Sequence, residues 1–163
     1  MTYTPYPTGG GSNQMSQRPP APSSIGNAVK LMYVGAGLSA LGVIISLATI
    51  GSLKSAILKR FPHYTAAQVH TAEVAGIVVV VVIGLIGVGL WLWMARMNAA
   101  GRSWARVVAS VLFGLYTLDE LLSFARAQGA GGLIFGLLSW LVGLGAIVFL
   151  WQRDSSQYFA ASR

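Results

Sequence analysis

Asp119 and Glu120 are the side chains with the most distinctive chemistry, because these two carboxylates stand side by side within a long apolar run. A carboxylate in hydrocarbon is costly and is by default a candidate functional group. Both lie about 15 positions after the start of that run, roughly 22 Å along a helix and close to one membrane boundary. Three interpretations stay open: an interfacial pair that reaches water, a cation or proton site, and a contact with a cation such as Lys59, Arg60 or Arg126.

His63, His70 and Glu73 form the only group of metal-ligand residue types in the chain. His70 and Glu73 would share a helix face at the i, i+3 spacing, but the three residues match no closed zinc motif. We therefore predict a solvated helix start and no metal site. The chain has no cysteine, which excludes thiolate sites and disulfides. It also shows no nucleophile–base pair, phosphate-binding loop or nucleotide fingerprint, so we predict no catalytic residue, no cofactor and no enzymatic activity.

The elements that carry these residues are membrane spans. Of the 163 residues, 55% are hydrophobic and only 9% are charged, whereas soluble domains are about 25% charged. Four apolar runs, each long enough to cross a hydrocarbon core of ~30 Å as a helix, occupy about residues 31–53, 74–95, 104–124 and 133–151. Their polarity does not alternate, which excludes a membrane barrel. We predict an all-α fold: an integral membrane four-helix bundle in contact with the lipid bilayer.

The two ends of the chain differ from this membrane domain, which we place at residues 25–153. Residues 1–24 hold five of the six prolines and three consecutive glycines, and they cannot bury enough apolar surface to become ordered. We predict a disordered, partly polyproline-like tail. It is either a solvated leader or a segment that docks in an aromatic groove of a partner. Residues 154–163 are predicted to form a short C-terminal tail.

Local signals mark several helix ends. Ser24 is a candidate N-cap before the first span. Thr65 and Gln68 have the spacing of a capping box, which predicts that the second helix starts near Ala66. Gly101 is a candidate C-cap in the short hairpin between the second and third spans.

The distribution of Lys and Arg predicts the orientation. An even number of spans places both termini on one side, where we count seven cations: Arg18, Lys30, Arg96, Arg102, Arg106, Arg153 and Arg163. The opposite side carries four: Lys54, Lys59, Arg60 and Arg126. The positive-inside rule predicts a multi-pass protein of the cell membrane with both termini cytoplasmic. Around the first span alone, two cations lie on the side of the termini and three on the opposite side, which predicts the reverse orientation. We follow the count over the whole chain because three arginines lie in or beside the hairpin, close to two helix ends.

Small residues form a stripe along two of the spans, at offsets of four, three and four. The first span has Gly35, Ser39, Gly42 and Ser46, and the fourth has Gly132, Gly136, Ser139 and Gly143. Small residues let a neighbouring backbone approach closely, which matters in lipid because the hydrophobic effect does not drive helices together there. The stripes serve either the bundle itself or a homo-oligomer, and a larger membrane complex is a further possibility.

The hairpin of residues 91–106 combines tryptophans with three arginines. Four of the five tryptophans fall near this face, as an interfacial belt would: Trp91, Trp93, Trp104 and Trp151. Arg96, Arg102 and Arg106 are candidate contacts for anionic lipid headgroups. Because the basic residues are dispersed along membrane boundaries, we predict no nucleic-acid binding.

The same hairpin carries a resemblance. The pattern W-L-W-M-A-R, followed by G-R-S-W-A-R, resembles a group of uncharacterised small four-helix membrane proteins of actinobacteria with a Pro/Gly-rich cytoplasmic tail. The resemblance implies the four-helix architecture and carries no activity or site residue. The small multidrug-resistance transporters also have four helices, but they rely on a glutamate in the first helix, and residues 31–53 contain none.

These observations lead to two functional hypotheses. The first is a non-enzymatic integral membrane protein that acts as an accessory, scaffolding or anchoring component of the cytoplasmic membrane. The alternative is a small oligomeric transporter or channel that uses Asp119 or Glu120.

Overall fold

The computed structural model describes residues 20–125 and 130–161, and all regular structure within these ranges is helical. The elements are α1 (Ser23–Ala48), η1 (Ile50–Ser52), α2 (Leu53–Arg60), α3 (Ala66–Ala99), α4 (Ser103–Ala125), α5 (Ala130–Leu150) and α6 (Arg153–Ala161). Within the described part, α1, α3, α4 and α5 are long and apolar enough to cross a membrane. The predicted all-α, four-span architecture is thereby confirmed, and the chain is a multi-pass membrane protein. Apart from residues 20–24, the predicted N-terminal tail lies outside the described residues.

The long helices expose large aliphatic side chains. Ile83 on α3 is 63% exposed, Leu115 on α4 is 60% exposed and Ile134 on α5 is 70% exposed. Soluble monomers rarely expose extended apolar patches, whereas in a bilayer these side chains lie against acyl chains at no such cost. The outer faces of the bundle are therefore lipid-facing.

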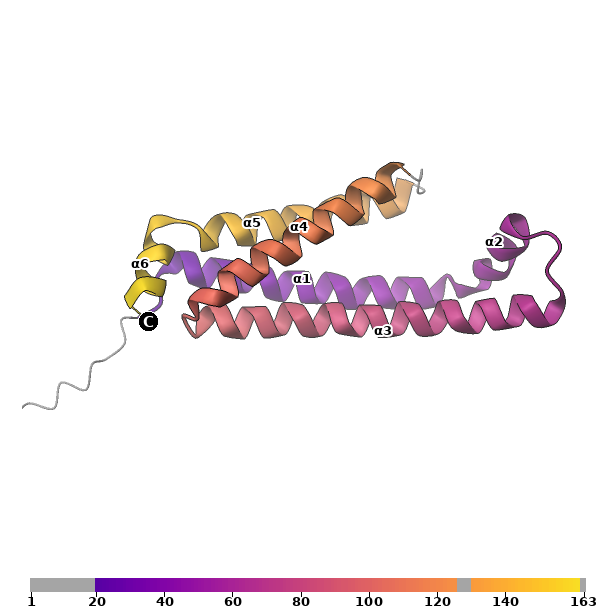
Figure 1. The fold of residues 1–163 in the computed structure, drawn as a ribbon, viewed down its shortest axis with the longest axis horizontal. Helices are drawn as coiled ribbons and strands as arrows, with labels where there is room; N and C mark the ends of the chain where they lie inside the picture. Colours follow the sequence, from indigo (N-terminus) through magenta and orange to yellow (C-terminus); the bar gives the residue numbers. More distant parts are fainter. Residues whose placement is uncertain (1–19, 126–129, 162–163) are drawn as a thin grey trace, which may run out of the picture.

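The four long helices are packed unequally (Figure 1). Helices α1 and α3 run side by side, α5 packs along α1, and α4 packs mainly against α5. We call the end where α1 begins and α6 lies the terminal end, and the end that carries α2 the loop end. Helix α4 leaves α3 at their hairpin at the terminal end and diverges from it toward the loop end. The bundle is therefore closed at one end and open at the other.

A cluster of two aromatic rings and two glycines holds the helices together near the middle of α1, α4 and α5. A Cβ at Gly35 on α1 would lie 2.7 Å from the Trp91 indole of α3, and one at Gly143 on α5 would lie 2.9 Å from the Phe113 ring of α4 and 3.7 Å from Trp91. The glycines thus admit rings that a side chain would displace. We call Gly35, Trp91, Phe113 and Gly143 the aromatic junction. Trp91, expected in the interfacial belt, packs between helices instead, because both glycines leave room for its ring.

Helix α3 begins and ends as its sequence signals predict. Gln68 N–H donates to Thr65 Oγ1 at 3.3 Å, and Thr65 N–H donates to Gln68 Oε1 at 2.8 Å, which completes the capping box. At the other end Gly101 has φ 70° and donates its N–H to the Asn98 carbonyl at 3.0 Å. Glycine adopts this left-handed conformation without a Cβ penalty. The capping box is confirmed, and Gly101 ends the helix as predicted, one residue after the C-cap Ala100.

Helix α1 departs from its predicted ends. The Ser24 N-cap is wrong: Pro22 occupies the cap position with φ −63° and ψ 158°, and the helix begins at Ser23. Proline has no N–H to satisfy and its fixed φ suits a helix start, so the chain is already helical at Ser24. At the far end α1 stops at Ala48, before the expected residue 53, and Thr49 Oγ1 donates back to the Ile45 carbonyl at 2.9 Å.

The segment expected as a C-terminal tail contains α6, which packs against the terminal end. Its buried face is formed by Ser155, Tyr158 and Phe159, at offsets of three and one, which lie on one side of a helix. The Ser155 hydroxyl is hydrogen-bonded to Ser24 at 2.8 Å, and the Tyr158 hydroxyl donates to the Ala99 carbonyl at 3.1 Å. Helix α6 thereby joins the start of α1 to the end of α3.

Candidate functional site

A cleft of about 620 Å³ lies between α3 and α4, with α1 and α5 as its other walls. It exists because α4 diverges from α3 beyond their hairpin while both helices keep contact with the rest of the bundle. Along α1 the lining runs from Met32 to Ser46, a length of about 21 Å at the helical rise. Pockets between the helices of a bundle are common places for ligands.

The cleft changes polarity along its length. Toward the loop end its lining combines the polar residues Ser46, Tyr116, Asp119 and Ser139 with apolar ones such as Val79 and Phe135. Toward the terminal end the lining is apolar and consists of residues such as Leu90, Met94, Ala109, Leu112 and Ile147. Trp91 and Phe113 of the aromatic junction also line this deeper part, where they meet over Gly143. The cleft therefore has its one charged group and most of its hydroxyl groups toward the mouth, and an apolar depth.

The two acidic residues of α4 face different neighbours, as adjacent positions on a helix must, since they point about 100° apart. Asp119 is exposed and lines the cleft. Glu120 is half-buried, and its carboxylate lies against α5 where Gly136 has no side chain. Of the three cations considered as partners, Lys59 and Arg60 lie on α2, which packs against α3, and Arg126 lies outside the described residues.

A polar seam joins α4 to α5 beside the cleft. The Tyr116 hydroxyl donates to the Gly136 carbonyl at 3.3 Å, and Trp140 Nε1 donates to Thr117 Oγ1 at 3.0 Å. Interhelical hydrogen bonds in membranes contribute on average about 0.6 kcal/mol each. These two bonds hold α4 on α5 beside the Glu120 carboxylate. Sequence reasoning missed Trp140 as part of this seam, since only the packed pair places Thr117 beneath it.

The predicted packing stripes divide between two roles. Their glycines contact other helices of the same chain: Gly35 lies against Trp91, Gly42 against Phe135, Gly136 against Glu120 and Gly143 against Phe113. Their serines line the cleft: Ser39, Ser46 and Ser139. Gly132, the first member of the second stripe, is exposed at the start of α5.

The three hairpin arginines also separate. Arg96 and Arg102 are exposed. The Arg106 guanidinium instead lies 4.6 Å from the Trp151 ring centre and 5.4 Å from that of Phe159, and its Nη1 donates to Ser156 Oγ at 3.2 Å. A guanidinium over aromatic faces is attracted by the ring quadrupoles. Arg106 therefore fastens α6 to the bundle, a role that the sequence analysis did not foresee.

Asn98 is a buried polar residue that the sequence analysis missed. It is fully buried at the end of α3, where its Nδ2 donates to the Met94 carbonyl at 2.8 Å and lies 4.0 Å from Met32 Sδ. Both methionines line the deep end of the cleft. The Asn98 Oδ1 has no hydrogen-bond partner among the described residues, which is uncommon for a buried acceptor.

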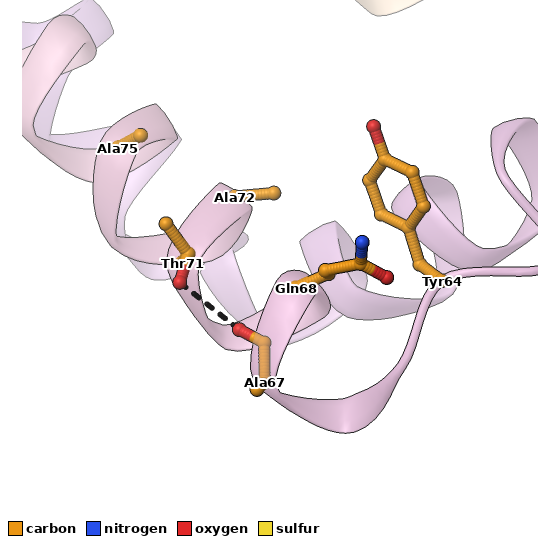
Figure 2. Close-up of a pocket in the computed structure, with 6 residues that line it drawn as sticks. All are labelled: Tyr64, Ala67, Gln68, Thr71, Ala72 and Ala75. Carbon is orange, nitrogen blue, oxygen red and sulfur yellow. Dashed lines mark hydrogen bonds between the residues drawn. The ribbon is translucent and has the colours of Figure 1, made fainter.

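The histidines lie near a second, shallower hollow at the start of α3. His63 and His70 are exposed and Glu73 is half-buried, and the described residues contain no group of three His, Asp or Glu side chains that could hold a metal. Figure 2 shows the hollow, about 400 Å³, with Gln68 and Thr71 among its lining residues. Gln68 belongs to the capping box and Thr71 donates to a backbone carbonyl at 3.0 Å. The Gln68 Oε1 and the Thr71 hydroxyl are thus already used within α3 and its cap.

Comparisons of the chain with protein-family models, with curated proteins and with solved structures find no match. The function is therefore inferred from the cleft, the polar seam and the terminal end.

Proposed function

We propose that this chain is a non-enzymatic accessory, scaffolding or anchoring component of the cytoplasmic membrane. The observation that carries the proposal is the deep half of the cleft, which is apolar and includes the aromatic junction. A transport pathway needs polar groups at successive depths. Here the hydroxyl side chains of the lining reach no deeper along α1 than Ser39, which favours a structural role over conduction.

The terminal end is the part we assign to the cytoplasm. Among the described residues, its exposed cations are Lys30, Arg96, Arg102 and Arg153, in line with the excess of positive charge on that side. Each cation near an anionic leaflet contributes about 1 kcal/mol of attraction. Helix α6 adds a folded surface at the same place. In this proposal Arg96 and Arg102 hold lipid headgroups while the two termini present attachment points to a partner.

Purification from native membranes tests the accessory role. The protein, tagged at its N-terminus because α6 is packed at the other end, is extracted in mild detergent and analysed by mass spectrometry. Recovery with a stoichiometric partner that remains through a second, size-based separation is expected. Recovery of the chain alone as a defined oligomer would count against an accessory role.

The transporter or channel remains the second candidate, and one observation favours it. Tyr116, Asp119, Ser46 and Ser139 gather at the mouth of the cleft, where hydroxyl and carboxylate oxygens suit a cation. The test is ion and proton flux in proteoliposomes with the parent protein, Asp119→Asn and Glu120→Gln. Flux that is present in the parent and lost in a variant with unchanged membrane insertion supports transport. An absence of flux in the parent rules out the transporter or channel hypothesis.

We also propose a relationship to the small four-helix membrane proteins of actinobacteria. The pattern that carries the resemblance coincides with positions that have a defined role: Gly101 forms the turn, Trp93 and Trp104 pack with ring centres 5.7 Å apart, and Arg106 binds α6. If the relationship holds, sequences of that group keep glycine and arginine at the positions aligned with Gly101 and Arg106. Free variation at both positions would contradict it.

A further inference from the structure

We propose that the cleft between α3 and α4 binds one membrane phospholipid, with an amine-bearing headgroup at the loop end and an acyl chain that extends toward the aromatic junction. The cleft opens sideways between two lipid-facing helices, so the bilayer itself supplies the ligand. Three features favour this occupant over a helix or a second copy: the width of the cleft, its polarity gradient and the charge at its mouth.

The width fits an acyl chain. The cleft holds about 620 Å³ along a length of about 21 Å. An α-helix with side chains is about 10 Å across, whereas an acyl chain is only one carbon wide and packs at contacts of about 3.5–4.0 Å, so it needs far less separation between α3 and α4. The hairpin closed by Gly101 ties α3 to α4 at the terminal end. The deep part of the cleft therefore cannot widen to admit a helix.

The polarity gradient gives the lipid a direction. The walls of the deep half are apolar side chains, including Leu90, Met94 and Ile147 beside the two aromatic rings of the junction, and methionine adapts easily to an irregular apolar partner. The mouth presents the hydroxyls of Ser46, Tyr116 and Ser139. An amphiphile whose head is at the loop end and whose tail reaches inward matches both halves.

The charge at the mouth selects the headgroup. Asp119 is the only charged side chain among the described residues that line the cleft. A carboxylate forms its strongest hydrogen bonds with charged donors such as an ammonium group, and it repels a headgroup that brings only negative charge. The site therefore prefers phosphatidylethanolamine to phosphatidylglycerol.

A matched pair of glycine variants tests occupancy. Gly87 lines the cleft and Gly89 does not, and at both positions a Cβ would meet no atom within 4 Å. The full chain is reconstituted into bilayer nanodiscs of equal phosphatidylethanolamine and phosphatidylglycerol, released, and examined by native mass spectrometry. The parent and Gly89→Leu are expected to retain one phospholipid, while Gly87→Leu retains about tenfold less because it fills the same space. Circular dichroism checks that all three remain folded.

A second pair tests the headgroup. Asp119→Asn removes the charge at the mouth, and Glu73→Gln makes the same change at a loop-end position outside the cleft lining. The parent and Glu73→Gln should favour phosphatidylethanolamine by about tenfold, the worth of a charged hydrogen bond. Asp119→Asn should retain a lipid without that preference.

The outcomes that overturn the proposal are distinct. Equal retention in Gly87→Leu and Gly89→Leu shows that the lipid sits elsewhere. A parent protein that is free of lipid and dimeric, and that becomes monomeric in Gly87→Leu, shows that a second copy fills the cleft. A lack of discrimination between headgroups in the parent removes the role of Asp119.

Discussion

The indole of Trp91 lies in the space that a side chain at position 35 would need, with its ring atoms 2.7 Å from the place of a Cβ on Gly35. This contact sets how closely α1 and α3 approach. Because Trp91 also reaches Gly143 on α5, the same ring fixes three helices. The stability of the bundle should therefore depend on residues that have no side chain.

Gly35→Ala should destabilise the protein by about 1–3 kcal/mol, since an added methyl group overpacks the Trp91 ring. The check is thermal unfolding in detergent, followed by circular dichroism. Gly37→Ala is the matched control, because a Cβ there meets no atom within 4 Å. It should leave the midpoint temperature of unfolding unchanged or raise it slightly. Equal midpoints for the two variants would contradict the assigned contact.

Gly136→Ala should lower the stability of the protein less than Gly35→Ala does, although the added Cβ would also overlap a neighbouring group. The neighbour is the Glu120 carboxylate, which ends a flexible side chain and can rotate away, so the loss should be about 1 kcal/mol. The same unfolding assay gives the order of the two variants. Gly114→Ala on α4, where a Cβ meets no atom within 4 Å, serves as the control, and a loss at Gly136 that exceeds that at Gly35 would refute this ranking.

Phe159→Ala should release α6 from the terminal end. Phe159 is only 1% exposed and lies beneath the Arg106 guanidinium, and truncation of a buried phenylalanine costs about 3–5 kcal/mol. Hydrogen exchange measured by mass spectrometry should accelerate in residues 153–161 while α3 stays protected. Gln157→Ala, at an exposed position of the same helix, should exchange like the parent protein. Unchanged protection in Phe159→Ala would mean that α6 does not depend on this contact.

Single cysteines can determine the orientation, because the chain has none of its own. Ser52→Cys at the loop end and Ala100→Cys in the hairpin are both at exposed positions. A membrane-impermeant maleimide should label Ser52→Cys in intact cells and Ala100→Cys only after lysis, as expected if the terminal end is cytoplasmic. The reverse pattern would invert the assignment of both termini.

The features that the sequence predicts correctly depend on neighbours along the chain. The four spans follow from runs of apolar residues, and the ends of α3 follow from Thr65, Gln68 and Gly101, whose capping bonds join residues three apart. Ser24 shows where such local reasoning stops. Its type and position suit a cap, but Pro22 occupies the cap position and the helix starts earlier. The Ser24 hydroxyl is instead hydrogen-bonded to Ser155, which is far away in sequence.

The cleft lies beyond local patterns for a similar reason. Its position depends on the divergence of α4 from α3, which follows from the packing of α4 on α5 through Thr117 and Trp140. The residue types at the mouth were recognised in part, since Asp119 stands out in any apolar run. Sequence alone could not tell that Asp119 lines a cleft while Glu120 lies against Gly136.

Helix α3 is longer than a bilayer requires. Its 34 residues span about 51 Å, against a hydrocarbon thickness of ~30 Å. A tilt large enough to absorb the difference would exceed the usual range of about 0–40°. The first turns of α3, which carry the polar residues Gln68, His70 and Glu73, therefore project beyond the lipid on the loop side. Helix α2 packs against α3, and His70 is held in the aqueous phase at a distance from the membrane surface.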